Sequence, residues 1–315
     1  MIRRNSLLAV VFLHVALLVG VPGGAHASIL GDSNADNLLN IADPVYLLNH
    51  LYRGGPSSPS GSRPDANCDG AVSLSDAIVL VEYFFLAGEA PGDFCSREIP
   101  AGLAYQRHNE QGFAEFEHRD TGILFVLLPG GDFLMGTPEN EEDRWQDESP
   151  LHLVTLSAFL VGKYEVTQAQ WEGVMGSNPS FFQGDALAEG VESSNLPVER
   201  VSWDDVVEFI VLSGFSLPSE AQWEYACRGG SSGPFAGTGV LADMGWYVEN
   251  SGGRPHAVGT RRPNAFGLYD LHGNLYEWCG DVYNEGFYAS GEASGPDPVY
   301  NGTGDYHVVR GGGWF

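Results

Sequence analysis

The chain has 315 residues, and its 15 lysine and arginine residues against 41 aspartate and glutamate residues give a formal net charge of −26 at pH 7. A surface this acidic repels phosphate backbones and anionic lipids, which excludes nucleic acid and anionic membranes as main partners. The apolar fraction of 43% is sufficient for a sizeable core, and the length predicts two modules. Such acidity is typical of an extracellular, salt-tolerant or calcium-binding protein.

The N-terminus has the pattern of a signal peptide. Arg3 and Arg4 precede an apolar run at residues 7–21, and Ala25-His26-Ala27 has the small-x-small pattern of a cleavage site. The run is shorter than the roughly 20 residues that span a bilayer. We therefore expect residues 1–27 to be removed and the mature protein to be exported to the periplasm, the medium or the cell surface. An uncleaved anchor is the alternative, and no later stretch is predicted to cross a membrane.

Two segments repeat at an offset of 33 residues and carry oxygen ligands with the spacing of a calcium loop. The first comprises Asp32, Asn34, Asp36, Leu38, Asn40 and Asp43. The second comprises Asp65, Asn67, Asp69, Ala71, Ser73 and Asp76. Leu38 and Ala71 contribute backbone carbonyls, and an amphipathic helical pattern follows each loop. The sequence therefore predicts paired calcium sites, of which the first is weakened by Asn37, where the tight turn favours glycine.

These residues resemble a dockerin, with an aspartate at position 12 of each loop and only the following helix. The resemblance implies a small α-helical, EF-hand-like module at residues 28–96 that docks onto a cohesin domain. The pair that guides partner choice in many dockerins reads Ile41-Ala42 and Leu74-Ser75 here. A calcium-stabilised spacer without a cohesin partner is the alternative.

The elements of the second module follow a linker, which we place at residues 97–120. Residues 123–128 and 133–136 are expected to form a β-hairpin across Pro129-Gly130-Gly131, and residues 154–161 a further strand.

Three capping patterns then predict short helices. They begin after Thr167, Ser202 and Ser219 and end near Gly176, Gly214 and Gly229. Beyond Gly229 the glycine-, proline- and asparagine-rich chain predicts packed loops and short strands. The expected class is α+β with little regular secondary structure.

General catalytic signatures do not account for this module. Residues 229–233 match G-x-S-x-G but follow a helix, so we interpret them as a flexible turn and not as a nucleophile elbow. His256, His272 and His307 lack metal-ligand spacing.

A series of segments instead resembles the formylglycine-generating enzyme (sulfatase-modifying factor) family over residues 121–315. The segments are 133–136 (FLMG), 164–167 (YEVT), 197–198 (PV), 201–205 (VSWDD), 217–230 (LPSEAQWEYACRGG), 264–270 (NAFGLYD), 273–278 (GNLYEW) and 310–314 (RGGGW). The resemblance implies a C-type-lectin-like fold. Active members use O₂ and a copper ion, held by two cysteines, to oxidise a sulfatase cysteine to formylglycine.

Copper is expected only if the native chain extends to the family's cysteine pair, which follows the segment matching residues 310–314. Gly313 also stands where active members have serine, and Tyr276 where they have tryptophan. We therefore assign no catalytic residue and do not expect the chain as given to perform the oxidation.

The resemblance also implies a calcium site in the second module. Its motif positions fall on the side chains of Asp270 and Glu277 and on the carbonyls of Gly273 and Leu275. Mixed carboxylate and carbonyl oxygens suit calcium. The alternative is that both carboxylates are ordinary surface groups.

The four cysteines allow several pairings. Cys68 and Cys95 can bridge one calcium loop to its helix, or remain free. Cys227 and Cys279 can bridge each other, although the resemblance implies that at least one pairs with a cysteine beyond this chain. A nucleophilic role for either is disfavoured because the sequence positions no base beside it.

Three functional hypotheses follow. The first is an exported oxidase tethered near sulfatases by its dockerin-like module. The second is a non-catalytic, lectin-like protein that binds a sulfatase or glycan ligand in a glycan-degrading assembly. The third is a fragment with an incomplete fold.

Overall fold

The computed structural model describes residues 2–3, 11–12, 16–18, 102–141, 144–187 and 190–315. The predicted cleavage site, both predicted calcium loops, the dockerin-like module, Cys68 and Cys95 lie outside the described residues. The chain divides into two compact units, of which the larger comprises Met1–Leu18 and Arg107–Phe315. No helix among the described residues is long and apolar enough to span a bilayer.

A five-stranded sheet contains the apolar run predicted as a strand. Its order is β3 (Ala16–Leu18), β9 (Phe159–Gly162), β6 (Leu124–Leu128), β5 (Ala114–His118) and β4 (Leu103–His108). β6 pairs antiparallel with β5 on one side and β9 on the other. Both neighbours cover its backbone groups, and its side chains Phe125, Val126 and Leu128 are buried.

The segment predicted as a linker is instead part of this sheet. β4 and β5 lie within residues 97–120, and Leu103, Ala114 and Phe116 are buried. Glu115 of β5 is also buried, where its carboxylate accepts a hydrogen bond from Lys163 Nζ at 2.5 Å. The linker prediction was wrong because β5 alternates apolar and charged residues. The partner of its buried Glu115 is Lys163, 48 residues further along the chain, so local sequence did not indicate a strand.

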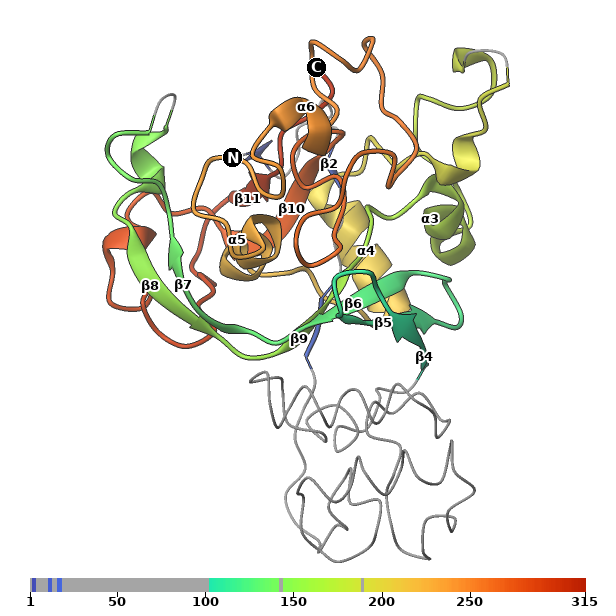
Figure 1. Ribbon diagram of the computed structural model, residues 1–315. Coiled ribbons are helices and arrows are strands. Elements are labelled where there is room, and N and C mark those ends of the chain that lie inside the picture. The colour runs from blue at the N-terminus through green and yellow to red at the C-terminus, as the bar shows by residue number, and fades with distance from the viewer. Residues whose placement is uncertain (1, 4–10, 13–15, 19–101, 142–143, 188–189) are drawn as a thin grey trace, which may run out of the picture. The chain divides into compact units, whose positions relative to one another are not determined.

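The predicted hairpin of residues 123–128 with 133–136 was also wrong. β7 (Gly131–Met135) pairs antiparallel with β8 (His152–Leu156), and the two form a ribbon on the left of Figure 1. Gly130 and Gly131 have φ of 74° and 113°, and a Cβ on Gly130 would lie 2.3 Å from the Leu156 carbonyl oxygen. The two glycines thus lead the chain out of β6 toward β8.

The single strand predicted at residues 154–161 is two strands, β8 and β9. They are separated at Ser157, whose backbone nitrogen and hydroxyl both donate to the carboxylate of Asp297 at 2.7 Å. These bonds replace sheet pairing at the corner where the chain passes from one sheet to the other.

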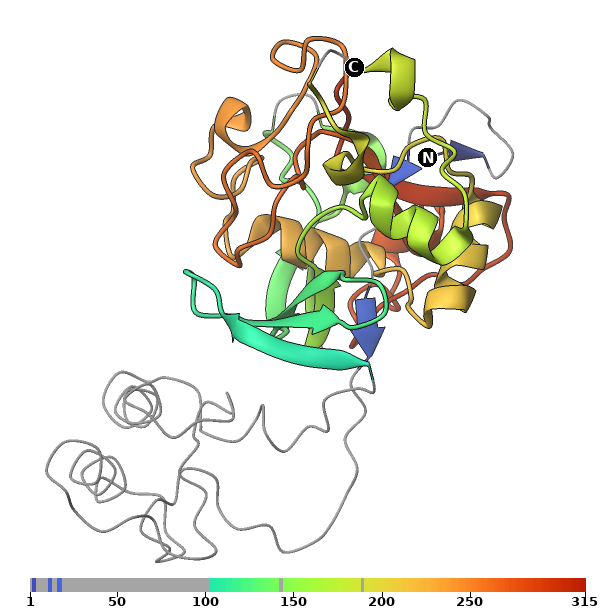
Figure 2. The ribbon, with the colours of Figure 1, turned by 90° about the vertical axis from the view of Figure 1, so that its right-hand side faces the viewer.

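The three predicted helices are confirmed. They are α3 (Gln168–Met175), α4 (Trp203–Ser213) and α5 (Glu220–Arg228), each with a reciprocal capping box at its start and a left-handed glycine at its end. α3 and α4 lie together on the face shown in Figure 2 and pack through stacked rings of Trp171 and Phe209, whose centroids are 4.9 Å apart.

A second sheet has the order β1 (Ile2–Arg3), β11 (Tyr306–Arg310), β10 (Tyr276–Val282) and β2 (Val11–Phe12). β1, β2 and β3 lie within residues 1–27, whose removal as a signal peptide stays a prediction. α5 contacts both this sheet and the β7–β8 ribbon, and it lies between them in Figure 1.

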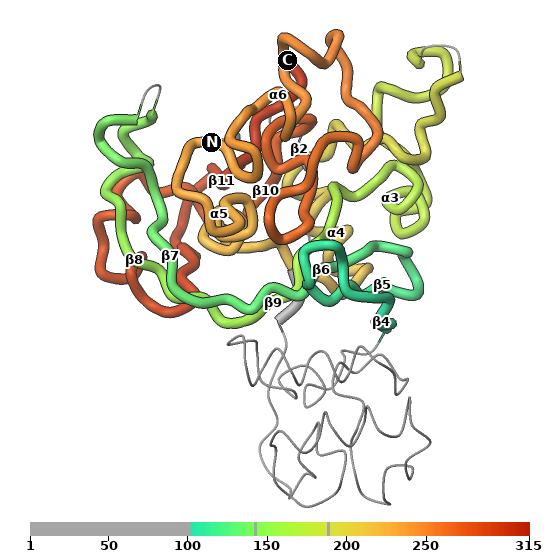
Figure 3. The backbone as a smooth tube through the Cα atoms, viewed as in Figure 1, coloured from blue at the N-terminus to red at the C-terminus, as the bar shows by residue number. Residues whose placement is uncertain are grey.

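Short elements and irregular chain make up the rest of the described domain. They are α6 (Leu241–Met244) and the 3₁₀ turns η1 (Gln146–Glu148), η2 (Gly184–Ala186), η3 (Ser193–Asn195) and η4 (Phe287–Ala289). Long irregular stretches connect α5 to β10 and β10 to β11 in Figure 3. The α+β class with little regular structure is confirmed.

Replacing Ser202 with alanine should lower the free energy of unfolding by about 1 kcal/mol, because the cap of α4 is lost. In the native helix the Ser202 hydroxyl accepts from the Asp205 backbone nitrogen. Urea denaturation of the purified protein measures the change. Ser202→Thr, which retains both the capping oxygen and the hydroxyl that donates to Asp205 Oδ2, should recover most of the loss; equal losses in both variants would contradict the role of the cap.

Candidate functional site

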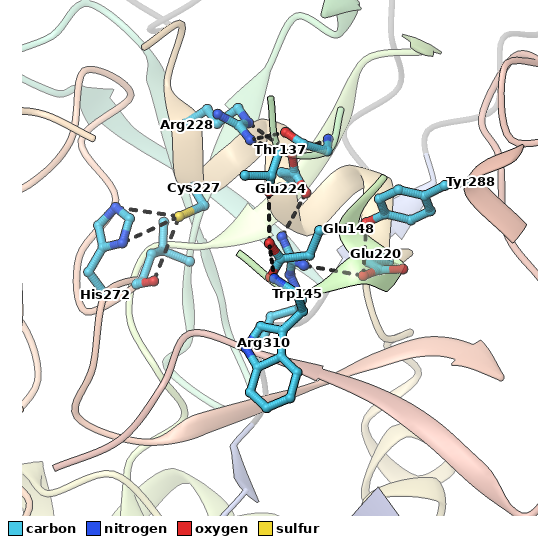
Figure 4. A network of polar contacts seen from close by, with 12 residues as sticks. Thr137, Trp145, Glu148, Glu220, Glu224, Cys227, Arg228, His272, Tyr288 and Arg310 are labelled. Carbon is cyan, nitrogen blue, oxygen red and sulfur yellow. Dashed lines mark hydrogen bonds and ion pairs between the residues drawn. The ribbon is translucent and has the colours of Figure 1, made fainter. Parts of the chain in front are cut away.

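One buried carboxylate, Glu224, joins three parts of the domain beside α5. Its Oε1 accepts from the Gly136 backbone nitrogen at 2.8 Å and from Arg228 Nε at 2.9 Å. Its Oε2 accepts from Arg310 Nη2 at 2.6 Å. The contacts link the end of β7, helix α5 and the end of β11, as Figure 4 shows.

The helical repeat explains why α5 supplies this network. Glu220, Glu224 and Arg228 are spaced four residues apart and therefore lie along one face of the helix. Arg310 faces this row and also donates from Nη1 to Glu220 Oε1 at 3.3 Å. Glu220 accepts a further hydrogen bond from the Tyr288 hydroxyl at 3.1 Å.

The two carboxyl groups of this row titrate differently. Burial acts to raise the pKa of Glu224, but Arg310 and Arg228 outweigh it and hold the pKa below its ordinary value. Burial raises the pKa of Glu220 to about 7. The Arg310 guanidinium opposes this rise, and the nearby carboxylates of Asp281 and Glu224 reinforce it. Glu224 is therefore a permanent anion near neutral pH, whereas Glu220 is only partly ionised.

Two adjoining cavities, of about 340 and 450 Å³, open over this network. Both are lined by Trp145, Glu148, Tyr276, Val309 and Arg310. We call the combined hollow the Arg310 groove.

Acidic and aromatic side chains dominate the lining of the Arg310 groove. The carboxyl-bearing residues are Glu141, Asp147, Glu148, Glu220, Glu224 and Asp281. The arginines are Arg228 and Arg310, and both are paired with Glu224. The aromatic residues are Trp145, Trp223, Tyr276, Tyr283, Phe287, Tyr288 and Tyr300. The groove thus offers negative potential and aromatic surface, a combination that attracts cationic groups.

Cys227 and Cys279 are buried free thiols, so they do not bridge each other. Burial raises the pKa of both thiols well above the ordinary value. Cys227 Sγ lies 3.5 Å from His272 Nε2, but that nitrogen accepts a hydrogen bond from the Ala236 backbone nitrogen at 3.0 Å. Since burial also lowers the pKa of His272 to about 4, the imidazole is neutral and does not generate a thiolate.

These cysteines do not fit the copper ion that the family resemblance implies. Copper(I) is held by thiolates, and both described thiols are protonated and enclosed in the core. Within the described residues no group of three or more His, Cys, Asp or Glu side chains has metal-binding geometry.

Three of the residues predicted for the second module's calcium site, Asp270, Gly273 and Leu275, lie in the irregular chain before β10, and Glu277 lies in β10 itself. Asp270 and Glu277 are both buried, so they are not ordinary surface carboxylates. Asp270 Oδ2 accepts from the Gly259 backbone nitrogen at 2.6 Å, and Glu277 Oε2 accepts from Trp223 Nε1 at 2.7 Å. Gly273 has a φ of 120°, and a Cβ there would lie 2.3 Å from the Trp246 carbonyl oxygen.

Sequence reasoning missed Glu165, a third buried carboxylate in this cluster. Its Oε1 accepts from the Leu275 backbone nitrogen at 3.1 Å and its Oε2 from Asn274 Nδ2 at 2.5 Å. Burial raises its pKa, and the negative charges of Asp270 and Glu277 raise it further. A divalent cation would relieve that repulsion. The three carboxylates do not, however, form a metal-binding group in the described part of the chain, so calcium binding stays a prediction.

The comparisons with known proteins follow the same part of the chain. The model of the "Sulfatase-modifying factor enzyme 1-like domain" matches residues 111–315. The formylglycine-generating enzyme of Streptomyces coelicolor is 32% identical over 246 residues, which span 60% of this chain and 78% of that protein. A protein of Paenibacillus barcinonensis named chaperone protein LppX is 28% identical over 248 residues, with the same two coverages. The structure of PvdO from Pseudomonas aeruginosa covers 67% of this chain and 88% of its own, with a TM-score of 0.53 and 28% identity.

Replacing Glu220 with glutamine should make stability less dependent on pH. In the unfolded chain this carboxyl ionises near its ordinary pKa of 4.5, whereas in the folded protein it ionises near 7. As pH rises through this window the unfolded state ionises first, so the wild type loses stability that Glu220→Gln retains. The loss is on the order of 1–3 kcal/mol by linkage.

Urea denaturation of both proteins between about pH 5 and pH 8 measures this effect, since the window follows from linkage. Asp281, whose pKa burial raises to about 6, titrates in both proteins, so the difference between them reports the ionisation of Glu220 together with its repulsion by Asp281. A difference that stays constant with pH, or that favours the wild type as pH rises, would contradict the ionisation assigned to Glu220.

Proposed function

This chain belongs to the sulfatase-modifying factor family, and we propose that it serves as a calcium-stabilised binding protein whose Arg310 groove receives a basic polypeptide segment. The observation that carries the proposal is the lining of the groove, in which carboxyl groups outnumber guanidinium groups and aromatic rings are frequent. Arginine and lysine side chains combine charge and apolar length, so they suit such a surface.

Cys227 and Cys279 are buried and protonated, so neither is a candidate copper ligand or nucleophile in the proposed binding protein. The name of a relative, chaperone protein LppX, also describes a protein other than an oxidase.

The two departures from the pattern of active members lie against each other. A Cβ on Gly313 would be 3.3 Å from the ring carbons of Tyr276, which lines both cavities. A serine at 313 would therefore crowd this tyrosine. Glycine at 313 and tyrosine at 276 thus replace the serine and the tryptophan of active members. The tyrosine ring packs against Gly313 and forms part of the groove wall, as expected for a surface that binds a ligand.

Formylglycine generation is the second candidate function. The S. coelicolor formylglycine-generating enzyme and the match to the family model favour it. It needs two thiolate ligands other than Cys227 and Cys279. Conversion of a sulfatase-derived cysteine peptide to the aldehyde, followed by mass spectrometry in the presence of copper and O₂, tests it directly.

The remaining parts of the proposal rest on the sequence. We infer export after removal of residues 1–27, and two calcium ions held by the loops of the dockerin-like module. A cohesin-like domain is the partner proposed for that module, which would place the groove beside a sulfatase or glycan in a larger assembly.

A short arginine-containing peptide should bind the purified protein more tightly than its glutamate-substituted counterpart, measured by fluorescence anisotropy. Glu148→Gln should weaken arginine-peptide binding by about threefold to tenfold, since one groove charge is lost, and added salt should weaken it further. Glu208→Gln removes an exposed charge of α4 outside the groove and serves as the control. Equal binding of both peptides, or equal losses in both variants, would overturn the proposal.

Calcium should raise the melting temperature of the protein, and Asp270→Asn should reduce the gain. A ligand present at about a hundred times its dissociation constant adds about 2.7 kcal/mol of stability. Asparagine tolerates the φ of 61° found at Asp270, so the variant removes charge without backbone strain. Asp185→Asn, an exposed position, is the matched control. If Asp270→Asn responds to calcium as this control does, the site is not at Asp270.

A further inference from the structure

A third cavity, of about 580 Å³, lies apart from the residues of the Arg310 groove. Its lining includes Asn195, Trp246, Arg254, His256 and Thr260. Most of these residues belong to the irregular orange chain between α6 and β10 in Figure 1. The cavity has the size of a small-molecule site.

Trp246 organises the basic side chains of this region. The His256 ring stacks on it at a centroid distance of 3.6 Å and an interplanar angle of 10°. The Arg261 guanidinium carbon lies 3.6 Å from the same ring centroid. Two groups at this distance cannot share one face, so the indole is held between the imidazole and the guanidinium. Its Nε1 donates to the Thr260 hydroxyl at 2.9 Å, which fixes the ring in its plane.

Two arginines of this cluster, like Arg119, Arg144 and Arg262, are absent from the ion pairs of the described residues. Arg107, Lys163, Arg200, Arg228 and Arg310 are paired with carboxylates in the described residues. The same ion pairs include neither Arg254 nor Arg261, and Arg261 Nε is buried without a hydrogen-bond partner. Both arginines lie close enough to His256 to depress its pKa, after the larger effect of burial. The acidic residue that lines the cavity is Glu192, which is exposed and therefore well solvated.

We propose that this cavity binds a small organic oxyanion, namely a monosaccharide-sized ligand that carries one sulfate or carboxylate group. Arg254 supplies the positive charge at the cavity wall, and Asn195 offers its side-chain amide to the uncharged part of the ligand. Arg261 is not a lining residue and adds positive potential from the other face of the Trp246 indole. Guanidinium groups recognise such oxyanions with paired, charge-assisted hydrogen bonds.

The net charge of the chain limits the size of this ligand. A charge of −26 repels an extended polyanion over long range, whereas one oxyanion group is governed by the local cluster. The inference therefore favours a short anionic sugar over a nucleic acid or a densely charged polymer. It does not depend on what occupies the Arg310 groove.

Isothermal titration calorimetry of the full chain tests the proposal at constant ionic strength. Galactose 6-sulfate and glucuronate carry the oxyanion on a sugar, sodium sulfate supplies the free anion, and galactose is the neutral control. Saturable binding of a charged sugar, and not of galactose, is expected. If free sulfate binds as tightly as the charged sugars, the cavity is still an oxyanion site, but the sugar ring contributes nothing to the affinity.

Arg254→Gln should weaken the affinity for the charged sugars by at least about tenfold, because hydrogen bonds between the guanidinium and the oxyanion are lost. Arg254 is exposed, so the variant should fold, and an unchanged melting temperature confirms it. Arg261→Gln should weaken binding less than Arg254→Gln does, because Arg261 lies outside the cavity lining and acts only through its charge. Arg119→Gln removes an equal charge from an exposed position outside the cavity lining and should bind like the wild type.

Two results would overturn the proposal. One is the absence of binding by both charged sugars and by sulfate at millimolar concentration. The other is binding that Arg254→Gln reduces no more than Arg119→Gln does, since Arg254 would then not form the site.

Discussion

The buried carboxylate of Glu224 is the constraint on which the candidate site depends. It is 3% exposed, and its hydrogen bonds to Gly136, Arg228 and Arg310 come from three separate elements. A buried carboxylate without partners would cost several kcal/mol, so the end of β7, helix α5 and the end of β11 must meet in this arrangement. The Arg310 groove lies over the place where these three elements contact one another.

The calcium-binding loop proposed in the second module is connected to the same frame through Trp223. This residue of α5 donates to Glu277, while the Arg310 guanidinium carbon lies 5.2 Å from its ring. Binding of an ion between Asp270 and Glu277 would therefore hold α5 at the position next to Glu224. Such coupling would stabilise the groove in a domain with little regular secondary structure.

Local signals in the sequence predicted local structure well. Each capping box acts within three residues, so Thr167, Ser202 and Ser219 fixed the starts of their helices. Pairing between distant segments was not predictable in this way, because the partner of β7 depends on the backbone around Gly130. For the same reason Glu165 was missed, since it reaches the calcium-site cluster from more than a hundred residues away.

A double-mutant cycle on Glu224 and Arg310 tests the central claim most directly. The free energy of unfolding is measured for the wild type, Glu224→Gln, Arg310→Met and the double variant. The account predicts that the single changes are each strongly destabilising and that the two sites are coupled by about 2–3 kcal/mol. Effects that simply add would show that Glu224 does not hold β11 against α5, and the basis for the groove would be lost.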